Sequence, residues 1–175
     1  QDYEAWYYEG GGIYRNVWLI KTDPLSVDLW GTCASSEHLD GDQWRVSIET
    51  EVRNDYYTDK TAQVVSKIVD PLGRTVARLT SDDTLFPSQT VTTVHHDVVL
   101  NDPTLWSPET CNLYTLYTEI VLDGDPIDNY ETTFGIREIR FDPNHGMYLN
   151  GKTTVIYGLA NHQLPVGVAN AMSDS

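Results

Sequence analysis

Metal binding is the first chemistry that the residue types suggest, because two histidines are adjacent and three aspartates surround one glycine. We expect His95 and His96 to lie on a strand, where neighbouring side chains point to opposite faces and cannot share one ion. Asp123, Asp125 and Asp128 could offer oxygen ligands to calcium, but the spacing of an EF-hand loop and its final glutamate are absent. A solvated turn is the favoured interpretation, and we predict no metal site and no cofactor.

Aromatic side chains gather near the N-terminus, at Trp6, Tyr7, Tyr8 and Trp18. Because aromatic rings pack well against pyranose rings, this cluster could form a platform for a sugar. Three of the four residues are consecutive, however, so both faces of a strand would carry a ring, which suits a packing surface between domains. We therefore predict inter-domain packing for these four side chains.

The charge of the chain limits its partners. Its 175 residues include 11 Lys and Arg against 26 Asp and Glu, which gives a formal net charge of −15. Nucleic acids and anionic membranes are recognised by basic surfaces, so this balance argues against both as partners. The hydrophobic fraction of 40% and the dispersed acidic residues predict a folded chain with one main domain. The sequence has no apolar run near the roughly 18 residues that a membrane-spanning helix needs.

The pattern of apolar residues predicts β-strands. Alternation with period 2 is clearest from Trp44 to Val52, where the residues between the inward positions are charged or Ser. Further strand patterns follow, with less regular alternation, at 62–69, 76–79, 91–100, 113–122 and 130–141. A turn containing Pro71 and Gly73 separates the first two of these. Asn150-Gly151 predicts a hairpin between strands at 147–149 and 153–159.

Together these strands predict an all-β fold, an immunoglobulin-like antiparallel β-sandwich of about seven strands over residues 21–142. The antibody form of this fold joins two central strands by a disulfide beside a buried Trp. Here Cys33 precedes the first central strand and Cys111 lies in a proline-containing loop, so the disulfide is disfavoured. We expect Trp44 to lie in the core and Trp106 to anchor a loop.

Several short segments stand out by their order along the chain. They are Trp6 to Gly10, Gly12 to Leu19, Leu105 to Glu109 with Leu113-Tyr114, Phe134 to Ile139, Gly146 to Lys152, and Gly158 to Gln163. Taken together, these segments resemble glycoside hydrolase family 2, the group of β-galactosidases, β-glucuronidases and β-mannosidases, and are most similar to its bacterial β-galactosidase-like members.

The resemblance implies a domain layout. Residues 1–20 would be the tail of an N-terminal jelly-roll sugar-binding domain, 21–142 the sandwich, and 143–175 the hairpin and first strand of a truncated (β/α)8 barrel. The chain would then be a piece of a longer enzyme, and its start at Gln1 instead of Met agrees with this expectation. At the junction of sandwich and barrel, we expect Glu138 to pair with Arg137 or Arg140.

The resemblance also implies where catalysis would take place. Retaining glycosidases use two carboxyl groups about 5 to 5.5 Å apart. In the family both are glutamates late in the barrel, the acid/base following an Asn, and this sequence has no Asn-Glu dipeptide. We therefore assign no catalytic residue.

The resemblance and the end of the expected barrel strand make Asn161 and His162 the candidates for contacting substrate in the intact enzyme. The alternative is a tail without defined structure in this segment. Related sequences often carry Asp after Asn-His-Gln, where this chain has Leu164, so the identity of the sugar stays open.

The leading hypothesis is a non-catalytic scaffold domain of a glycosidase that hydrolyses terminal β-glycosides, β-galactosides first among them. Its partners would be the neighbouring domains of the same polypeptide and, in the intact enzyme, a carbohydrate substrate. The alternative is an autonomous carbohydrate-binding or structural sandwich module. The resemblance favours a periplasmic or secreted parent protein, and a cytoplasmic one stays possible.

Overall fold

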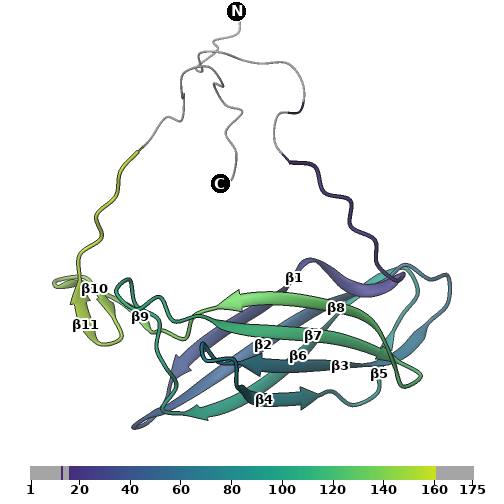
Figure 1. The fold of residues 1–175 in the computed structure, drawn as a ribbon, viewed down its shortest axis with the longest axis horizontal. Coiled ribbons are helices and arrows are strands. Elements are labelled where there is room, and N and C mark those ends of the chain that lie inside the picture. The colour runs from purple at the N-terminus through teal and green to yellow at the C-terminus, as the bar shows by residue number, and fades with distance from the viewer. Residues whose placement is uncertain (1–12, 14–15, 161–175) are drawn as a thin grey trace, which may run out of the picture. The chain divides into compact units, whose positions relative to one another are not determined.

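The computed structural model describes residue 13 and residues 16–160, and Figure 1 shows its course. The chain divides into two units, Thr22–Val155 and a second unit formed by Gln1–Lys21 with Ile156–Ser175. All the described strands lie in the first unit. The domain boundaries at residues 20 and 142 stay predictions.

The described residues form strands and no helix, which confirms the all-β class. The strands are β1 (Leu25–His38), β2 (Gln43–Asn54), β3 (Lys60–Val69), β4 (Thr75–Thr80), β5 (Thr84–Phe86), β6 (Thr90–Asn101), β7 (Tyr114–Leu122), β8 (Asp125–Phe134), β9 (Ile139–Asp142), β10 (Gly146–Leu149) and β11 (Lys152–Thr154). One sheet has the order β1-β2-β6, and the other has the order β4-β3-β7-β8 with β5 paired to β3. A third sheet, β11-β10-β9, follows the sandwich.

Strand β2 has the alternation that the sequence predicts. It pairs antiparallel with β1 on one side and with β6 on the other, so that Ile48 lies opposite both Ala34 and His96. Its inward residues are buried, from Trp44 to Asn54 at every second position, while most of the residues between them are exposed. The buried face of this strand therefore sets the register of its whole sheet.

The core lies between the two main sheets and consists of two apolar clusters. Both clusters contain residues of both sheets, which is typical of a sandwich. One contains Trp44, Val46, Ile48, Ile68, Leu100, Tyr114, Leu116, Phe134 and Ile136. The other contains Leu25, Val27, Val52, Ala62, Val64, Phe86, Val94 and Ile120.

The structure corrects three strand predictions. Strand β1 was not expected, because the alternation of its sequence is broken in the middle. The run predicted as one strand at 130–141 is two strands, β8 and β9, separated by residues 135–138. The second strand of the Asn150-Gly151 hairpin ends at Thr154, well before residue 159.

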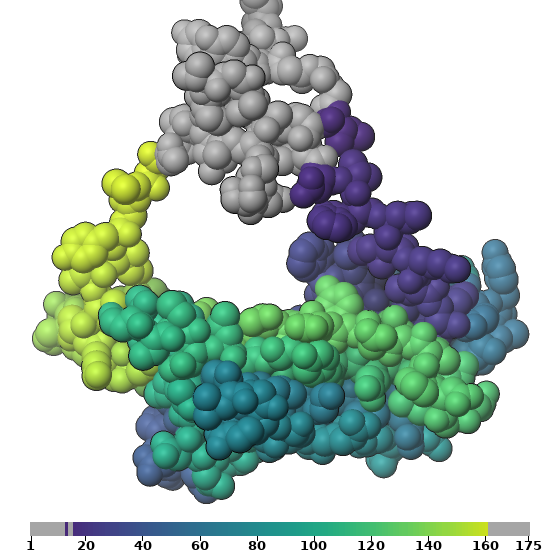
Figure 2. All heavy atoms as spheres, in the orientation of Figure 1, coloured from purple at the N-terminus to yellow at the C-terminus, as the bar shows by residue number. Residues whose placement is uncertain are grey.

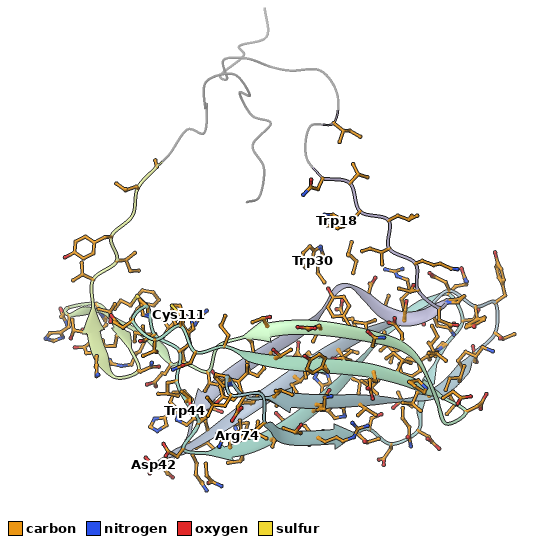
Figure 3. All side chains as sticks on the ribbon, viewed as in Figure 1. Trp18, Trp30, Asp42, Trp44, Arg74 and Cys111 are labelled. Atoms are coloured by element: carbon orange, nitrogen blue, oxygen red, sulfur yellow. The ribbon has the colours of Figure 1, made fainter. Side chains whose placement is uncertain are left out.

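The break in β1 is a β-bulge. The pairing of β1 with β2 shifts register between Val27 and Thr32, and Trp30 has a φ of 60°. A Cβ atom at Gly31 would lie 2.8 Å from the carbonyl oxygen of Asp28 and 2.9 Å from that of Glu51. Only glycine therefore fits at this position of the bulge. In Figure 3 the Trp30 side chain stands outside the sheets, in contrast to Trp44, which is almost fully buried.

Cys33 and Cys111 are both free and exposed. The described part of the chain contains no helix that is long and apolar enough to cross a membrane.

Candidate interdomain junction

Most of the residues chosen from the sequence as site candidates lie outside the described residues. This applies to the substrate-contact candidates Asn161 and His162 and to the packing candidates Trp6, Tyr7 and Tyr8. Trp18 is described and 80% of its surface is exposed. The roles of all six residues stay predictions. The described structure instead draws attention to the segment that leaves the sandwich, residues 135–150.

Trp106 anchors the beginning of this segment. Its backbone N–H donates a hydrogen bond of 2.8 Å to the carbonyl oxygen of Ile136. A Cβ atom at Gly135 would lie 2.7 Å from Cβ and 2.8 Å from Cγ of Trp106, so the indole lies directly on the backbone there. The guanidinium of Arg137 lies 4.8 Å from the centre of the same ring. The loop before β7 is thereby attached to the end of the sandwich, as the loop-anchor prediction for Trp106 required.

Asn150 attaches the β9–β11 sheet to the same place. Its backbone N–H donates to the carbonyl oxygen of Glu138 at 2.9 Å, and its Oδ1 accepts from the backbone N–H of Glu138 at 3.0 Å. Its Nδ2 donates to the carbonyl oxygen of Trp106 at 3.0 Å. Asn150 and Gly151 have φ values of 49° and 75°, as a two-residue hairpin turn needs. One residue therefore forms the hairpin turn and also connects three segments of backbone.

The expected ion pair of Glu138 is not among those that the described residues form. Arg137 lies over the ring of Trp106, and Arg140 lies over the ring of Tyr148, 4.1 Å from its centre. Arg140 also lies 3.7 Å from the carboxylate of Asp142. Both cations are thus held by aromatic rings, and the contribution of Glu138 at the junction is its backbone.

The carboxyl groups with shifted pKa values have identified structural partners. The guanidinium of Arg53 holds the pKa of Asp28 below its usual value. Burial raises the pKa of Asp128, whose Oδ2 accepts a hydrogen bond of 2.9 Å from the N–H of Val27. A raised pKa is what a glycosidase acid needs, but here the carboxyl holds the start of β1 against β8.

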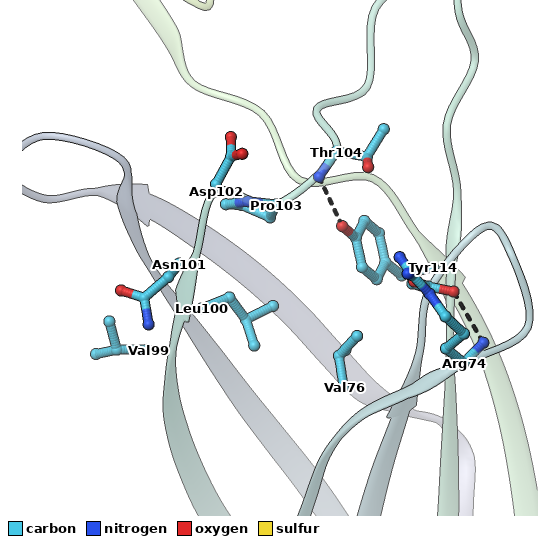
Figure 4. Close-up of a pocket in the computed structure, with 10 residues that line it drawn as sticks. Arg74, Val76, Val99, Leu100, Asn101, Asp102, Pro103, Thr104 and Tyr114 are labelled. Atoms are coloured by element: carbon cyan, nitrogen blue, oxygen red, sulfur yellow. Dashed lines mark hydrogen bonds and ion pairs between the residues drawn. The ribbon is translucent and has the colours of Figure 1, made fainter.

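A shallow pocket of about 330 Å³ lies between the β3–β4 turn and the segment after β6 (Figure 4). On its wall, Tyr114 Oη accepts a hydrogen bond of 2.9 Å from the N–H of Thr104. Burial raises the pKa of Asp70, but hydrogen bonds from the backbone and guanidinium of Arg74 outweigh this effect and lower it overall. The Asp70 carboxylate is paired with Arg74 and stabilises the β3–β4 turn.

The two adjacent histidines lie on opposite faces of β6, as predicted. His95 is exposed and its Nδ1 lies 3.7 Å from Glu49. His96 faces the other sheet, where its Nδ1 lies 2.9 Å from Ser66 Oγ, and burial lowers its pKa. The described residues contain no group of three or more His, Cys, Asp or Glu placed to hold a metal ion.

Away from the shallow pocket, the sheets of the sandwich present broad surfaces. Figure 2 shows the teal and green segments that contain β3, β4, β7 and β8 as one continuous face.

The sequence profile of the glycosyl hydrolases family 2 matches residues 33–137. The chain belongs to this family. A beta-galactosidase of Bacteroides ovatus is 35% identical over 156 residues, which are 89% of this chain and 18% of that protein. A beta-glucuronidase of Formosa agariphila is 31% identical over 168 residues, which are 90% of this chain and 17% of that protein.

Solved structures of family 2 proteins agree with the fold. The structure of Bacteroides uniformis beta-glucuronidase 2 superimposes with a TM-score of 0.83 at 27% identity, and covers 94% of this chain and 20% of that one. The chain thus spans less than a fifth of the length of these two curated relatives. The family expected from the short segments is confirmed, and β-galactosidases and β-glucuronidases both occur among its relatives.

Proposed function

We propose that this segment is the non-catalytic scaffold of a family 2 glycosidase that hydrolyses terminal β-glycosides. It would hold the domain before it and the catalytic barrel after it at a fixed distance. The observation that carries this proposal is the junction, where Trp106 and Asn150 tie the β9–β11 sheet to the end of the sandwich. A linker that only connected two domains would not need these long-range contacts.

Among terminal β-glycosides, we propose a β-galactoside as the substrate of the whole protein. Support comes from the beta-galactosidase of Bacteroides ovatus, at 35% identity, against 31% for the beta-glucuronidase of Formosa agariphila. Under the same proposal, Asn161 and His162 contact the sugar in the intact enzyme. The whole protein is proposed to be periplasmic or secreted.

The reading frame of the coding DNA after Ser175 gives the first test. The proposal expects it to continue for the length of a barrel, with an Asn-Glu pair and a later glutamate as the two carboxyl groups of a retaining enzyme. A stop codon directly after Ser175 would remove the catalytic role and leave a binding or structural module.

Turnover gives the second test. The 175-residue chain and the complete encoded polypeptide are purified side by side and assayed with chromogenic β-galactoside and β-glucuronide. We expect no turnover by the chain and turnover of the galactoside by the complete polypeptide. Turnover by the chain alone, at constant specific activity through purification, would disprove the scaffold role. A preference of the complete polypeptide for the glucuronide would correct the substrate only.

Asn150→Ala in the complete polypeptide tests the role of the junction. Because Asn150 is far from the expected catalytic carboxyls in sequence, a scaffold role predicts a lower kcat with intact binding of a competitive inhibitor. The exposed strand residue Asn129 provides a matched control, Asn129→Ala, which should leave both kcat and inhibitor binding unchanged. Equal activity of both variants would show that the junction does not position the barrel.

A further inference from the structure

The bulge of β1 exposes two large apolar side chains next to each other. Leu29 is 62% exposed and Trp30 is 84% exposed. The Trp30 side chain is given no hydrogen bond and no ring contact by the described residues. Large apolar groups that lie together on a surface are typical of interaction sites.

The bulge is held rigidly in this shape. Asp28 forms two hydrogen bonds with Arg53, from Nε at 2.9 Å and from the terminal guanidinium nitrogen at 2.7 Å. Its Oδ1 also accepts from the N–H of Leu29 at 2.9 Å. On the other side of Trp30, the backbone at Gly31 is packed so closely that a side chain does not fit. The exposed Trp30 is therefore built into the strand and is not the tip of a mobile loop.

The backbone of Trp30 is strained. Its φ of 60° is unfavourable for a bulky L-residue, and glycine would adopt it freely. Three other residues at positive φ, Gln89, Cys111 and Asn150, form side-chain hydrogen bonds in return. The side chain of Gln89, for example, donates to the carbonyl oxygen of Asp55 at 2.6 Å. Since Trp30 has no such contact within the described structure, a partner outside it would compensate for the strain.

The surroundings of the bulge indicate the chemistry of that partner. Three carboxylates raise the pKa of the Arg53 guanidinium. Asp28 does so by its hydrogen bonds, and Asp55 and Glu51 do so by their charge. After the pairing of Asp28 with Arg53, Glu51, whose backbone lies directly against Gly31, leaves the rim of the bulge acidic. A second copy of this chain, also with a net charge of −15, would be repelled. A complementary partner has an apolar pocket with a basic rim.

The position of the bulge in the chain indicates where this partner comes from. It lies in the first strand of the sandwich, while β9–β11, from which the chain continues, lie at the opposite end of the sandwich from the start of β1 (Figure 1). A domain joined ahead of β1 would be tethered only a few residues from Leu29, which gives it a high effective concentration at the bulge. The relatives are more than five times longer than their matched parts, so their sequences have room for such a domain.

We propose that Leu29 and Trp30 form the docking surface for the domain that precedes β1 in the complete polypeptide, which receives them in an apolar pocket rimmed by Lys or Arg. This inference rests on the proposed scaffold function and identifies the surface through which the sandwich holds its first neighbour. The second neighbour is held at the junction, at the other end.

Hydroxyl-radical footprinting of Trp30 tests the proposal directly. Oxidation of Trp30 is compared in the 175-residue chain and in the complete polypeptide, with Tyr57 as the internal reference because it is 91% exposed on the loop between β2 and β3. We expect at least a roughly fivefold lower rate for Trp30 in the complete polypeptide, with Tyr57 unchanged. Equal rates for Trp30 would overturn the proposal.

The same samples distinguish other occupants. Protection of Trp30 that rises with the concentration of the 175-residue chain would overturn the proposal in favour of self-association. Protection by added galacto-oligosaccharide alone would overturn it in favour of a glycan site. If the complete polypeptide turns over β-galactoside while Trp30 stays reactive, the docking proposal fails and the scaffold proposal stands. If Trp30 is protected and no glycoside is turned over, the scaffold proposal fails and the docking proposal stands.

The substitution Trp30→Gly gives an independent test, because the proposal expects opposite signs in two backgrounds. In the 175-residue chain it removes backbone strain, so Tm should rise by about 2–4 °C. In the complete polypeptide it removes the docked ring, so Tm should fall. The control Asp102→Gly, also at positive φ but at the other end of β6 from the bulge, should raise Tm in both. A rise in both backgrounds for Trp30→Gly would overturn the proposal.

Discussion

The bulge of β1 and the turn at Asn150 solve the same backbone problem in different ways. Both place a residue other than glycine at positive φ, 60° for Trp30 and 49° for Asn150. Asn150 suits this conformation because asparagine tolerates it better than most residues, and its side chain makes two hydrogen bonds to neighbouring backbone. Trp30 has neither advantage.

The difference shows which contacts offset the backbone strain at each of the two residues. At Asn150 the compensation lies inside the described structure, so the turn is a self-contained structural device. At Trp30 the described structure supplies the supports around the residue, Asp28, Arg53 and Gly31, but nothing for the indole. A strained residue with rigid supports and a free side chain is expected at a binding surface.

The largest effect is expected for Asn150→Ala. Alanine keeps the unfavourable φ and loses both side-chain hydrogen bonds, so the β9–β11 sheet should lose about 2–3 kcal/mol of local stability. Asn150→Gly loses the same hydrogen bonds without the backbone strain and should cost about 1–2 kcal/mol. Hydrogen exchange of the β9–β11 amides measures both, with Asn129→Ala as an exposed control. Equal costs for Ala and Gly would mean that positive φ at residue 150 carries no strain, and would break the comparison with Trp30.

The next effect is expected for Gly31→Ala. The new methyl group would meet the carbonyl oxygens of Asp28 and Glu51, which are backbone atoms and cannot turn away as a side chain can. We expect a loss of about 2 kcal/mol in the free energy of unfolding, measured by urea denaturation. Gly158→Ala, where a Cβ meets nothing within 4 Å, is the matched control and should change stability by less than about 0.5 kcal/mol. A neutral Gly31→Ala would show that the bulge adapts easily and does not hold Trp30 rigidly.

Part of the fold could be predicted from the sequence, because the signals for it lie in residues that are close together along the chain. The alternation from Trp44 to Val52 determines which face of β2 is buried, and Asn150-Gly151 is a turn signal in two adjacent residues. The family was also accessible, because its short segments keep their order along the chain. Trp44 and Trp106 lie where these patterns place them, in the core and on a loop.

The rest depends on contacts between residues that are distant in sequence. Strand β1 was missed because the bulge shifts its pairing register by three residues between Val27 and Thr32, and a period of 2 cannot continue across an odd shift. Nothing near Gly135 in sequence indicates the indole of Trp106 that requires it. Arg137 and Arg140 looked like partners of Glu138 by proximity, but aromatic rings 31 and 8 positions away from them hold both. The sequence analysis also chose Trp18, with Trp6, Tyr7 and Tyr8, for packing between domains and passed over Trp30.

The smallest effect concerns the ion pair that supports the bulge, tested by Asp28→Asn. The asparagine Oδ1 can still accept from the N–H of Leu29 but no longer pairs with Arg53, and partly exposed ion pairs contribute roughly 0.5 kcal/mol. The pH dependence identifies the cause. Because Arg53 lowers the pKa of Asp28 in the folded state from its usual 3.8, the ion pair stabilises the fold above that value. This stabilisation is lost as the pH falls through the lower, folded-state pKa.

The difference in Tm between the native chain and Asp28→Asn should therefore be present at about pH 6 and vanish at strongly acidic pH, below the folded-state pKa. No difference at about pH 6 either would assign the support of the bulge to the hydrogen bond of Leu29, which the asparagine keeps, instead of the ion pair. In that case the two regions would be more alike than the structure suggests, since both would then rest on side-chain to backbone hydrogen bonds. Only the uncovered indole of Trp30 would still separate them.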